Sequence, residues 1–166
     1  MSANTPEKDL GPEAPADLAP VPVDPWILAD VAYARYHDPH EVLGAHVGEN
    51  GVTSRTVRHL ADDVVVVTKD GTHPATHEQD GVWVAVLPGQ EIPDYRIKVT
   101  YGDETTTVDD PYRYMPTLGE MDTYLISEGR HEELWDVLGA HVKRYDGPLG
   151  EVEGTAFAVW APTPRA

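Results

Sequence analysis

The segment Asp94-Tyr95-Arg96-Ile97-Lys98-Val99-Thr100-Tyr101 alternates strictly between polar and apolar side chains. Its apolar face consists of Tyr95, Ile97, Val99 and Tyr101. Because successive side chains of a strand point to opposite faces of a sheet, this period of two predicts a strand with one face buried. It is the clearest strand signal in the 166-residue chain, and it indicates a mainly β fold.

The segments on both sides of this strand have the pattern of further short strands separated by turns. The run 64–67 consists of four valines, which predicts a strand buried on both faces. The run 82–87 is apolar at odd and even positions, so we expect it to be central in a sheet. Asp70-Gly71 and Asp80-Gly81 predict tight hairpin turns, and 105–108 supplies another strand. About six short strands with turn signals every 8 to 12 residues are typical of an immunoglobulin-like antiparallel β-sandwich.

The chain begins with a different composition. Residues 1–24 contain five prolines among alanines and acids, with few large apolar side chains, which predicts a disordered acidic tail. Asp24 can cap a helix that begins at Pro25 and ends near Tyr36. Trp26 belongs to the apolar pattern of this helix, so we expect it to be buried.

Helical signals return after the strands. Thr117 and Glu120 have the spacing of a capping box, and the helix that they open is expected to end at Gly129. A second short helix is predicted over about 131–138, with Trp135 on its apolar side.

The string Val-Leu-Gly-Ala-His occurs at 42–46 and again at 137–141, 95 residues later. Five identical residues in so short a chain indicate two copies of one module. Each copy leads through a polar loop into a strand signal, at 51–59 and at 154–160. The second copy stops at Ala166, and a single strand cannot bury itself. We therefore expect one complete module and the opening of a second, as part of a longer protein.

These signals predict a division of the chain into four regions. They are a disordered tail at 1–24, a β-sandwich with its leading helix at 25–116, a helical connector at 117–145 and the start of a second sandwich at 146–166. Trp160 is expected in the core of the second sandwich.

Charge and composition exclude several functions. The chain has 12 Lys and Arg against 29 Asp and Glu, a net charge of −17, which argues against nucleic-acid partners because a phosphate-binding surface must be basic. It has no cysteine, which removes disulfides and thiolate chemistry. No stretch approaches the roughly 20 apolar residues of a membrane span, and no export signal is present near the start. We expect a cytoplasmic protein without membrane partners.

Histidines could suggest a metal site, and the sequence argues against one. His73 and His77 are separated by Pro74, so they cannot share a helical face as zinc ligands. We predict neither a metal site nor a cofactor. His46 and His141 are interpreted as hydrogen-bonded residues of the turn in each repeated string.

Candidates for sugar chemistry are few. A retaining glycosidase needs two carboxyls about 5 Å apart across a cleft. The adjacent acids Asp62-Asp63 are more typical of a solvated turn, and Asp109-Asp110-Pro111 is more typical of the end of a strand. No catalytic residue is therefore predicted. Trp83 is the best glycan-binding candidate because a flat exposed ring can stack on a sugar. The alternative is that a helix covers its ring.

The chain resembles the bacterial 1,4-α-glucan (glycogen) branching enzymes, with an acidic proline-rich lead similar to that of actinobacterial members. The resemblance rests on five strings in matching order and spacing, at 37–46, 110–114, 127–131, 138–141 and 157–162. Within the second string, we expect Asp110, Pro111, Tyr112 and Arg113 to pack at an interdomain or intramolecular joint rather than on sugar.

The resemblance implies an N-terminal β-sandwich, a second sandwich of the family 48 carbohydrate-binding type, a family 13 glycoside hydrolase barrel and a C-terminal β-domain. It implies transfer of an α-1,4-glucan chain to a 6-hydroxyl in glycogen biosynthesis, with the catalytic residues on the barrel beyond Ala166. The expected partners are glycogen or amylose chains, the expected parent is a monomer, and this chain alone is expected to be inactive. The alternative is a structural or docking module of a debranching enzyme or trehalose-forming hydrolase, without glucan contact.

Overall fold

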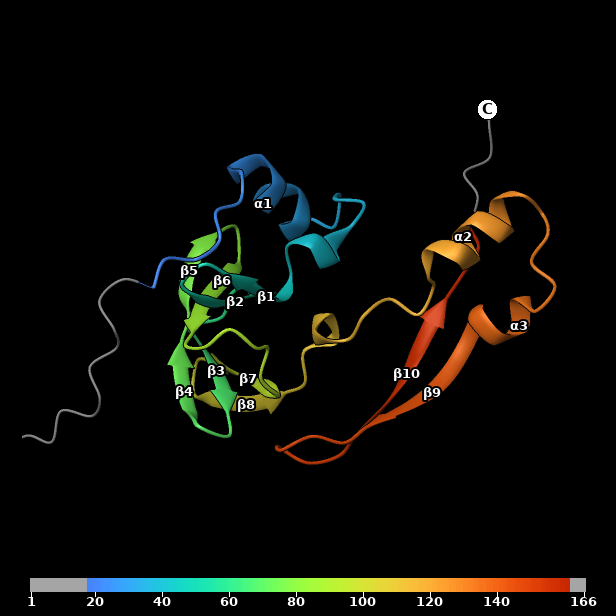
Figure 1. Cartoon of the computed structure of the whole chain (residues 1–166). Coiled ribbons are helices and arrows are strands. Elements are labelled where there is room, and N and C mark those ends of the chain that lie inside the picture. The colour runs from blue at the N-terminus through green and yellow to red at the C-terminus, as the bar shows by residue number, and fades with distance from the viewer. Residues whose placement is uncertain (1–17, 162–166) are drawn as a thin grey trace, which may run out of the picture.

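A computed structural model describes residues 18–161 of the chain. Two antiparallel four-stranded sheets pack against each other, in the orders β1-β2-β6-β5 and β4-β3-β7-β8 (Figure 1). The strands of the first sheet are β1 (Gly44–Gly48), β2 (Gly51–Val57), β6 (Val82–Leu87) and β5 (Thr76–Gln79). Those of the second are β4 (Gly71–Pro74), β3 (Asp63–Thr68), β7 (Tyr95–Tyr101) and β8 (Glu104–Val108). This arrangement confirms the expected antiparallel β-sandwich.

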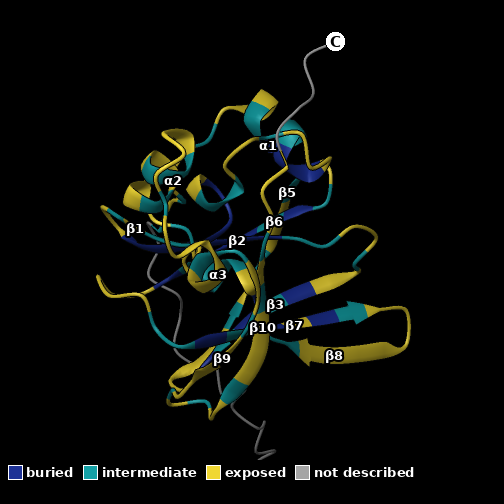
Figure 2. Cartoon of the chain, turned by 90° about the vertical axis from the view of Figure 1, so that its right-hand side faces the viewer, coloured by how far each residue is buried: buried dark blue, intermediate teal, exposed yellow. Residues whose placement is uncertain are grey.

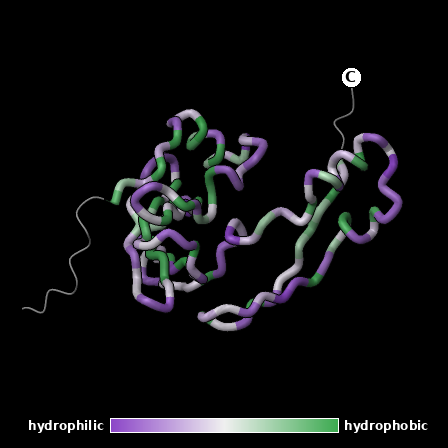
Figure 3. Tube along the Cα trace, in the orientation of Figure 1, coloured by the Kyte–Doolittle hydropathy of each residue, from purple (hydrophilic) through white to green (hydrophobic). Residues whose placement is uncertain are grey.

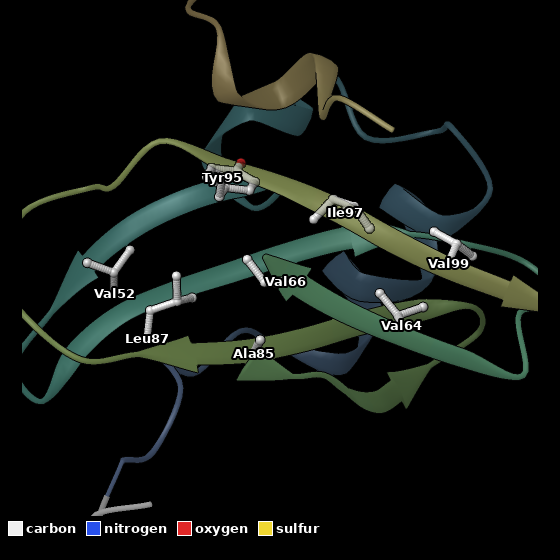
Figure 4. Packing of buried hydrophobic residues seen from close by; sticks show 8 residues of the cluster. All are labelled: Val52, Val64, Val66, Ala85, Leu87, Tyr95, Ile97 and Val99. Atoms are coloured by element: carbon white, nitrogen blue, oxygen red, sulfur yellow. The ribbon is translucent and has the colours of Figure 1, made fainter. Parts of the chain in front are cut away.

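The main core lies between the two sheets (Figure 4). Its members are Val52, Ala85 and Leu87 from the first sheet and Val64, Val66, Tyr95, Ile97 and Val99 from the second. The alternating pattern of β7 therefore predicted its buried face correctly, except at the strand end, where Tyr101 is 41% exposed.

The expectation that 64–67 is buried on both faces is wrong. Val64 and Val66 are buried in the core, whereas Val65 and Val67 are half-buried on the outer face of β3. There they pair across the strands with Lys98 and Arg96, whose long side chains cover them only in part.

A helix covers the outer face of the first sheet. Helix α1 (Pro25–Ala32) packs Leu28, Val31 and Ala32 against Val82 of β6. β6 is thus buried on both faces and lies between β2 and β5, as expected for a central strand.

Two details of α1 differ from the prediction. The helix ends at Ala32 rather than near Tyr36, because Ala34 adopts a left-handed backbone with φ 54°. Trp26 is 61% exposed rather than buried. It lies two positions before Leu28, and residues two apart point to different sides of a helix.

The segment preceding α1 is ordered from residue 18 onward, where the tail was expected to be disordered as far as Asp24. The Val21 N–H donates to Thr53 Oγ1 at 2.9 Å, and the Arg55 guanidinium donates to the Val21 carbonyl at 2.7 Å. These bonds attach the segment to β2. The rest of the predicted tail, 1–17, lies outside the described residues.

The chain after the sandwich contains two more helices and a hairpin. These are α2 (Glu120–Ser127), α3 (Leu134–Val137), β9 (Gly139–Tyr145) and β10 (Val152–Ala158), with short 3-10 turns η1 (Pro39–Glu41) and η2 (Pro111–Arg113) earlier in the chain. The connector expected to be helical over 117–145 is thus helical only as far as Val137. The residues after Val137 form strand β9 instead, and β9 pairs antiparallel with β10.

The two helices differ in detail from the prediction. Helix α2 begins after Gly119, whose N–H donates to Asp122 at 3.0 Å, so Thr117 is not its cap. Helix α3 covers four residues instead of 131–138. A single turn offers little surface to pack against, and Trp135 is 68% exposed rather than buried.

The two copies of the repeated string adopt the same local geometry. His46 bonds through Nε2 to the Leu43 carbonyl at 3.0 Å, and His141 bonds in the same way to the Leu138 carbonyl at 3.0 Å. Both are therefore hydrogen-bonded, as interpreted from the sequence, but they lie near the start of strands β1 and β9 rather than in a turn. Each string also leads into an antiparallel hairpin, β1–β2 and β9–β10.

The surroundings of the two hairpins differ. β2 is extended by β6 on its far side, whereas β10 pairs only with β9 within the described residues. As a result β9 and β10 are mostly exposed (Figure 2), although apolar segments run along them (Figure 3). Trp160, expected in a second core, is 57% exposed.

Candidate functional site

A surface pocket of about 500 Å³ surrounds the predicted glycan-binding residue, Trp83. It forms where the end of α1, the loop between β2 and β3 and the turn between β5 and β6 meet. The residues that line it are Tyr33, Arg58, His59, Leu60, Ala61, His77, Asp80, Gly81 and Trp83.

Trp83 forms a half-buried and fixed part of this pocket. Its indole Nε1–H donates to the Arg58 carbonyl at 3.1 Å, and its ring meets His77 edge-on at 5.4 Å between centroids. It packs against the core between the sheets, on the face of β6 opposite to Val82. The alternative prediction was that a helix covers the Trp83 ring. The ring is instead partly buried by the core of the sandwich.

Two further residues of the pocket were missed by the sequence reasoning. Tyr33 is 58% exposed and Leu60 is 92% exposed. The ring of Tyr33 stacks with His59 at 6.3 Å, and His59 bonds through Nε2 to the Ala32 carbonyl at 3.0 Å. A lone leucine in a polar loop was the only signal available for Leu60, and nothing in the sequence linked it to Trp83.

Asp110 of the predicted joint motif is 1% exposed. Its carboxylate accepts a hydrogen bond from the Tyr95 hydroxyl at 2.9 Å and another from the Tyr112 N–H at 3.1 Å. Burial raises the pKa of Asp110 above its ordinary value, and burial together with this carboxylate raises the pKa of Tyr95. Asp110 therefore ties the end of the sandwich to η2, which begins at Pro111.

Arg113 of the same motif lies in a cluster of charges between the sandwich and the β9–β10 hairpin. Its guanidinium bonds to Asp94, and it lies 3.3 Å from Asp109. Asp94 also pairs with Arg96 at 2.7 Å and accepts a bond from the Leu149 N–H, in the hairpin loop, at 2.8 Å.

An aromatic contact lies next to this cluster. The ring of Tyr114 stacks on Tyr145 of β9 with 4.3 Å between centroids. Burial and the neighbouring Asp109 raise the pKa of Tyr114 to about 12, so its hydroxyl stays protonated in the physiological range. Tyr112 meets His40 edge-on at 5.0 Å. All these contacts are made within the chain.

Acid should weaken the contact made by Asp94. Burial alone would raise the pKa of this carboxyl, but the Leu149 N–H, Arg96 and Arg113 outweigh it and lower the pKa below the ordinary value. An acid with a lowered folded pKa stabilises the fold above its unfolded pKa and loses that contribution as pH falls below about 4.

We therefore expect Asp94→Asn to lower the free energy of unfolding by about 1–3 kcal/mol at pH 7, with a smaller loss at pH 3. Urea unfolding at the two pH values measures both quantities. Asp103→Asn, in an exposed turn, serves as the control. An equal loss at pH 7 and pH 3 would show that the ionisation of Asp94 contributes nothing to stability.

The part of the chain that the structure describes has neither a metal-binding cluster nor a helix that could span a membrane. Among residues 18–161, no three His, Asp or Glu side chains gather in a way that could hold a metal ion. None of the helices in that range has the length and apolarity to cross a membrane.

The fold and pocket define the class of this chain: an antiparallel β-sandwich module with a leading helix and an aromatic-lined surface pocket. Residues 24–112 match the family described as alpha-1,4-glucan branching enzyme GlgB, N-terminal domain. The chain belongs to this family. The match confirms the resemblance to branching enzymes and favours it over debranching or trehalose-forming enzymes.

Curated relatives agree with the family match. A 1,4-alpha-glucan branching enzyme of Thermobifida fusca is 56% identical over 132 residues, which covers 78% of this chain and 18% of that protein. The enzyme of Rhodococcus jostii is 43% identical over 154 residues, covering 92% of this chain and 21% of the relative. The enzyme of Nocardia farcinica is 45% identical over 168 residues, which covers 93% of this chain and 23% of that protein. The chain thus spans about a fifth of the length of these relatives.

Proposed function

We propose that this chain acts as the N-terminal, non-catalytic region of a 1,4-alpha-glucan branching enzyme in glycogen synthesis, where it helps to position α-glucan chains. The family match over residues 24–112 is the observation that carries the proposal. The cytoplasm, where glycogen is made, is the proposed location, and a monomer is the proposed state of the parent enzyme.

The chemical step of the proposed reaction cleaves an α-1,4 linkage and joins the released chain to a 6-hydroxyl. Glycosyl transfer with retention requires two carboxyls about 5 Å apart. Asp80 is the single carboxylate among the residues lining the Trp83 pocket. This supports binding rather than catalysis by the pocket, and we assign the chemistry to another part of the enzyme.

The charge of the chain is compatible with an α-glucan as partner. A net charge of −17 would repel an anionic polymer over distances of about 10 Å, whereas an α-glucan is uncharged. Trp83, in the pocket, is the proposed glycan contact among the residues singled out from the sequence. Asp110, Pro111, Tyr112 and Arg113 are proposed to act at the joint instead.

We also propose that the second repeat opens a second sandwich, of the family 48 carbohydrate-binding type. The matching hydrogen bonds of His46 and His141 support this division. In the first copy β6 pairs with β2 and extends the hairpin into a sheet, whereas in the second copy Val142 and Phe157 are 66% and 74% exposed. The hairpin starts at Gly139, which would place the boundary before the connector's expected end at residue 145.

Native electrophoresis in gels with and without glycogen tests the glucan-positioning proposal. We expect glycogen to retard the 166-residue chain relative to an acidic protein of similar size. Unchanged mobility would contradict the proposal and favour a docking module without glucan contact. In a parallel assay, amylose incubated with the chain should keep its iodine colour, and loss of colour would contradict a non-catalytic role.

A further inference from the structure

Unfavourable backbone conformations gather around the Trp83 pocket. Among residues 18–161, three residues other than glycine have positive φ: Ala34 at 54°, Leu60 at 61° and Asp80 at 49°. Leu60 and Asp80 line the pocket, and Ala34 directly follows Tyr33, which also lines it. Strained residues persist where the surrounding structure holds them, often at ligand sites.

Leu60 is the most informative of the three. Asp80 precedes Gly81 in a tight turn, where aspartate accepts this conformation, and Ala34 ends a helix. For Leu60 the left-handed backbone is strained, and glycine or asparagine would fit the loop better. No packing compensates for the strain, because the side chain is 92% exposed. The loop thus holds an apolar side chain in water beside Tyr33.

The composition of the pocket indicates the class of ligand. Its apolar side chains are Tyr33, Leu60 and Trp83, and the polar groups include two histidines and one carboxylate. A pyranose has an apolar face that lies against such side chains and hydroxyls that require donors and acceptors. A volume of about 500 Å³ is within the range of small-ligand pockets, about 300–1,000 Å³.

Hydrogen bonds within the chain fix the roles of the two pocket histidines. His77 Nε2 accepts a hydrogen bond from the Gly81 N–H at 3.1 Å, which places the proton of a neutral ring on Nδ1 as a donor. His59 Nε2 lies 3.0 Å from the Ala32 carbonyl and donates to it, and its Nδ1 lies against Gly81, so His59 forms part of the pocket wall.

We propose that this pocket binds a glucosyl unit of an α-1,4-glucan, with Leu60 and Tyr33 contacting the sugar and Trp83 forming the fixed floor. The inference rests on the proposed function, because the choice of glucan comes from the family. It adds the location of the site and two residues that the sequence did not single out.

The test compares maltoheptaose binding by the 166-residue chain and its variants, using isothermal titration calorimetry. Leu60→Gly relieves the backbone strain and removes the sugar contact, so it should bind about tenfold more weakly with an unchanged or higher thermal unfolding midpoint. Tyr33→Ala should also bind about tenfold more weakly. Ile92→Gly, at an exposed apolar residue that does not line the pocket, should bind like the wild type.

Each other outcome has a defined meaning. Wild-type affinity in either Leu60→Gly or Tyr33→Ala would overturn the inference, and so would a wild type that does not bind maltoheptaose. Weaker binding by Leu60→Gly together with a lowered midpoint would make Leu60 a structural residue and also overturn it. Retardation by glycogen decides the proposed function separately, because it registers binding anywhere on the chain.

Discussion

Replacing Arg55 by methionine is expected to lower the free energy of unfolding by about 3 kcal/mol or more. The Arg55 side chain is 2% exposed, yet its charge is fully engaged. Nε and Nη2 bond to the two oxygens of Glu78 at 2.7 and 3.0 Å, and Nη2 also donates to the Val21 carbonyl. Removing this guanidinium leaves a partly buried carboxylate and a carbonyl without their partner.

Urea unfolding measures this effect, and the chain provides a matched control. Arg144 pairs with Glu153 at 2.5 Å, but both side chains are more than half exposed. Arg144→Met should therefore change stability by less than about 1 kcal/mol. Hydrogen exchange at the Val21 amide should also become faster in Arg55→Met. Equal effects of the two arginine substitutions would contradict the role assigned to the buried pair.

Gly44→Ala is expected to be the second strongly destabilising change, and Gly139→Ala is its counterpart in the repeat. Both glycines have positive φ, 85° and 99°, so alanine at either position meets backbone strain of about 1–2 kcal/mol. At Gly44 the added Cβ would also collide with the backbone carbonyl of Tyr112. At Gly139 nothing lies within 4 Å of it.

The expected loss is therefore about 3 kcal/mol or more for Gly44→Ala and about 1–2 kcal/mol for Gly139→Ala. Chemical unfolding followed by tryptophan fluorescence measures the loss for Gly44→Ala. Amide exchange in β9 and β10 measures the loss for Gly139→Ala, since the hairpin can open on its own. If both substitutions had the same effect, the close packing of the first string on η2 would not matter for stability.

Local periodicity explains which parts of the fold could be predicted. The alternation of 95–101 and the doubly apolar run 82–87 depend on neighbours in the sequence, and both strands form as expected. The outer face of β3 depends instead on Arg96 and Lys98 of another strand, which no local pattern shows. Trp26 was predicted to be buried because it belongs to the apolar pattern of the first helix, although its position on that helix turns it to solvent.

The residues of the Trp83 pocket also show what local sequence patterns can and cannot predict. Trp83 could be chosen from the sequence because it is a single flat ring in an aliphatic strand. Tyr33 and Leu60 could not, because three separate segments meet to form the pocket and the φ angle of Leu60 has no sequence signal. From the sequence alone Arg55 would be taken as a surface charge, because no local pattern shows that it pairs with the distant Glu78.

The proposed glucan site at the Trp83 pocket can be observed directly in solution. Nuclear magnetic resonance of the chain during titration with maltoheptaose tests it most directly, by observing leucine methyl groups and indole N–H signals. We expect saturable shifts of the Leu60 methyls and the Trp83 indole N–H, with Trp135 and Trp160 unchanged. Absence of shifts at Leu60 and Trp83, or shifts confined to the β9–β10 region, would contradict the proposed site.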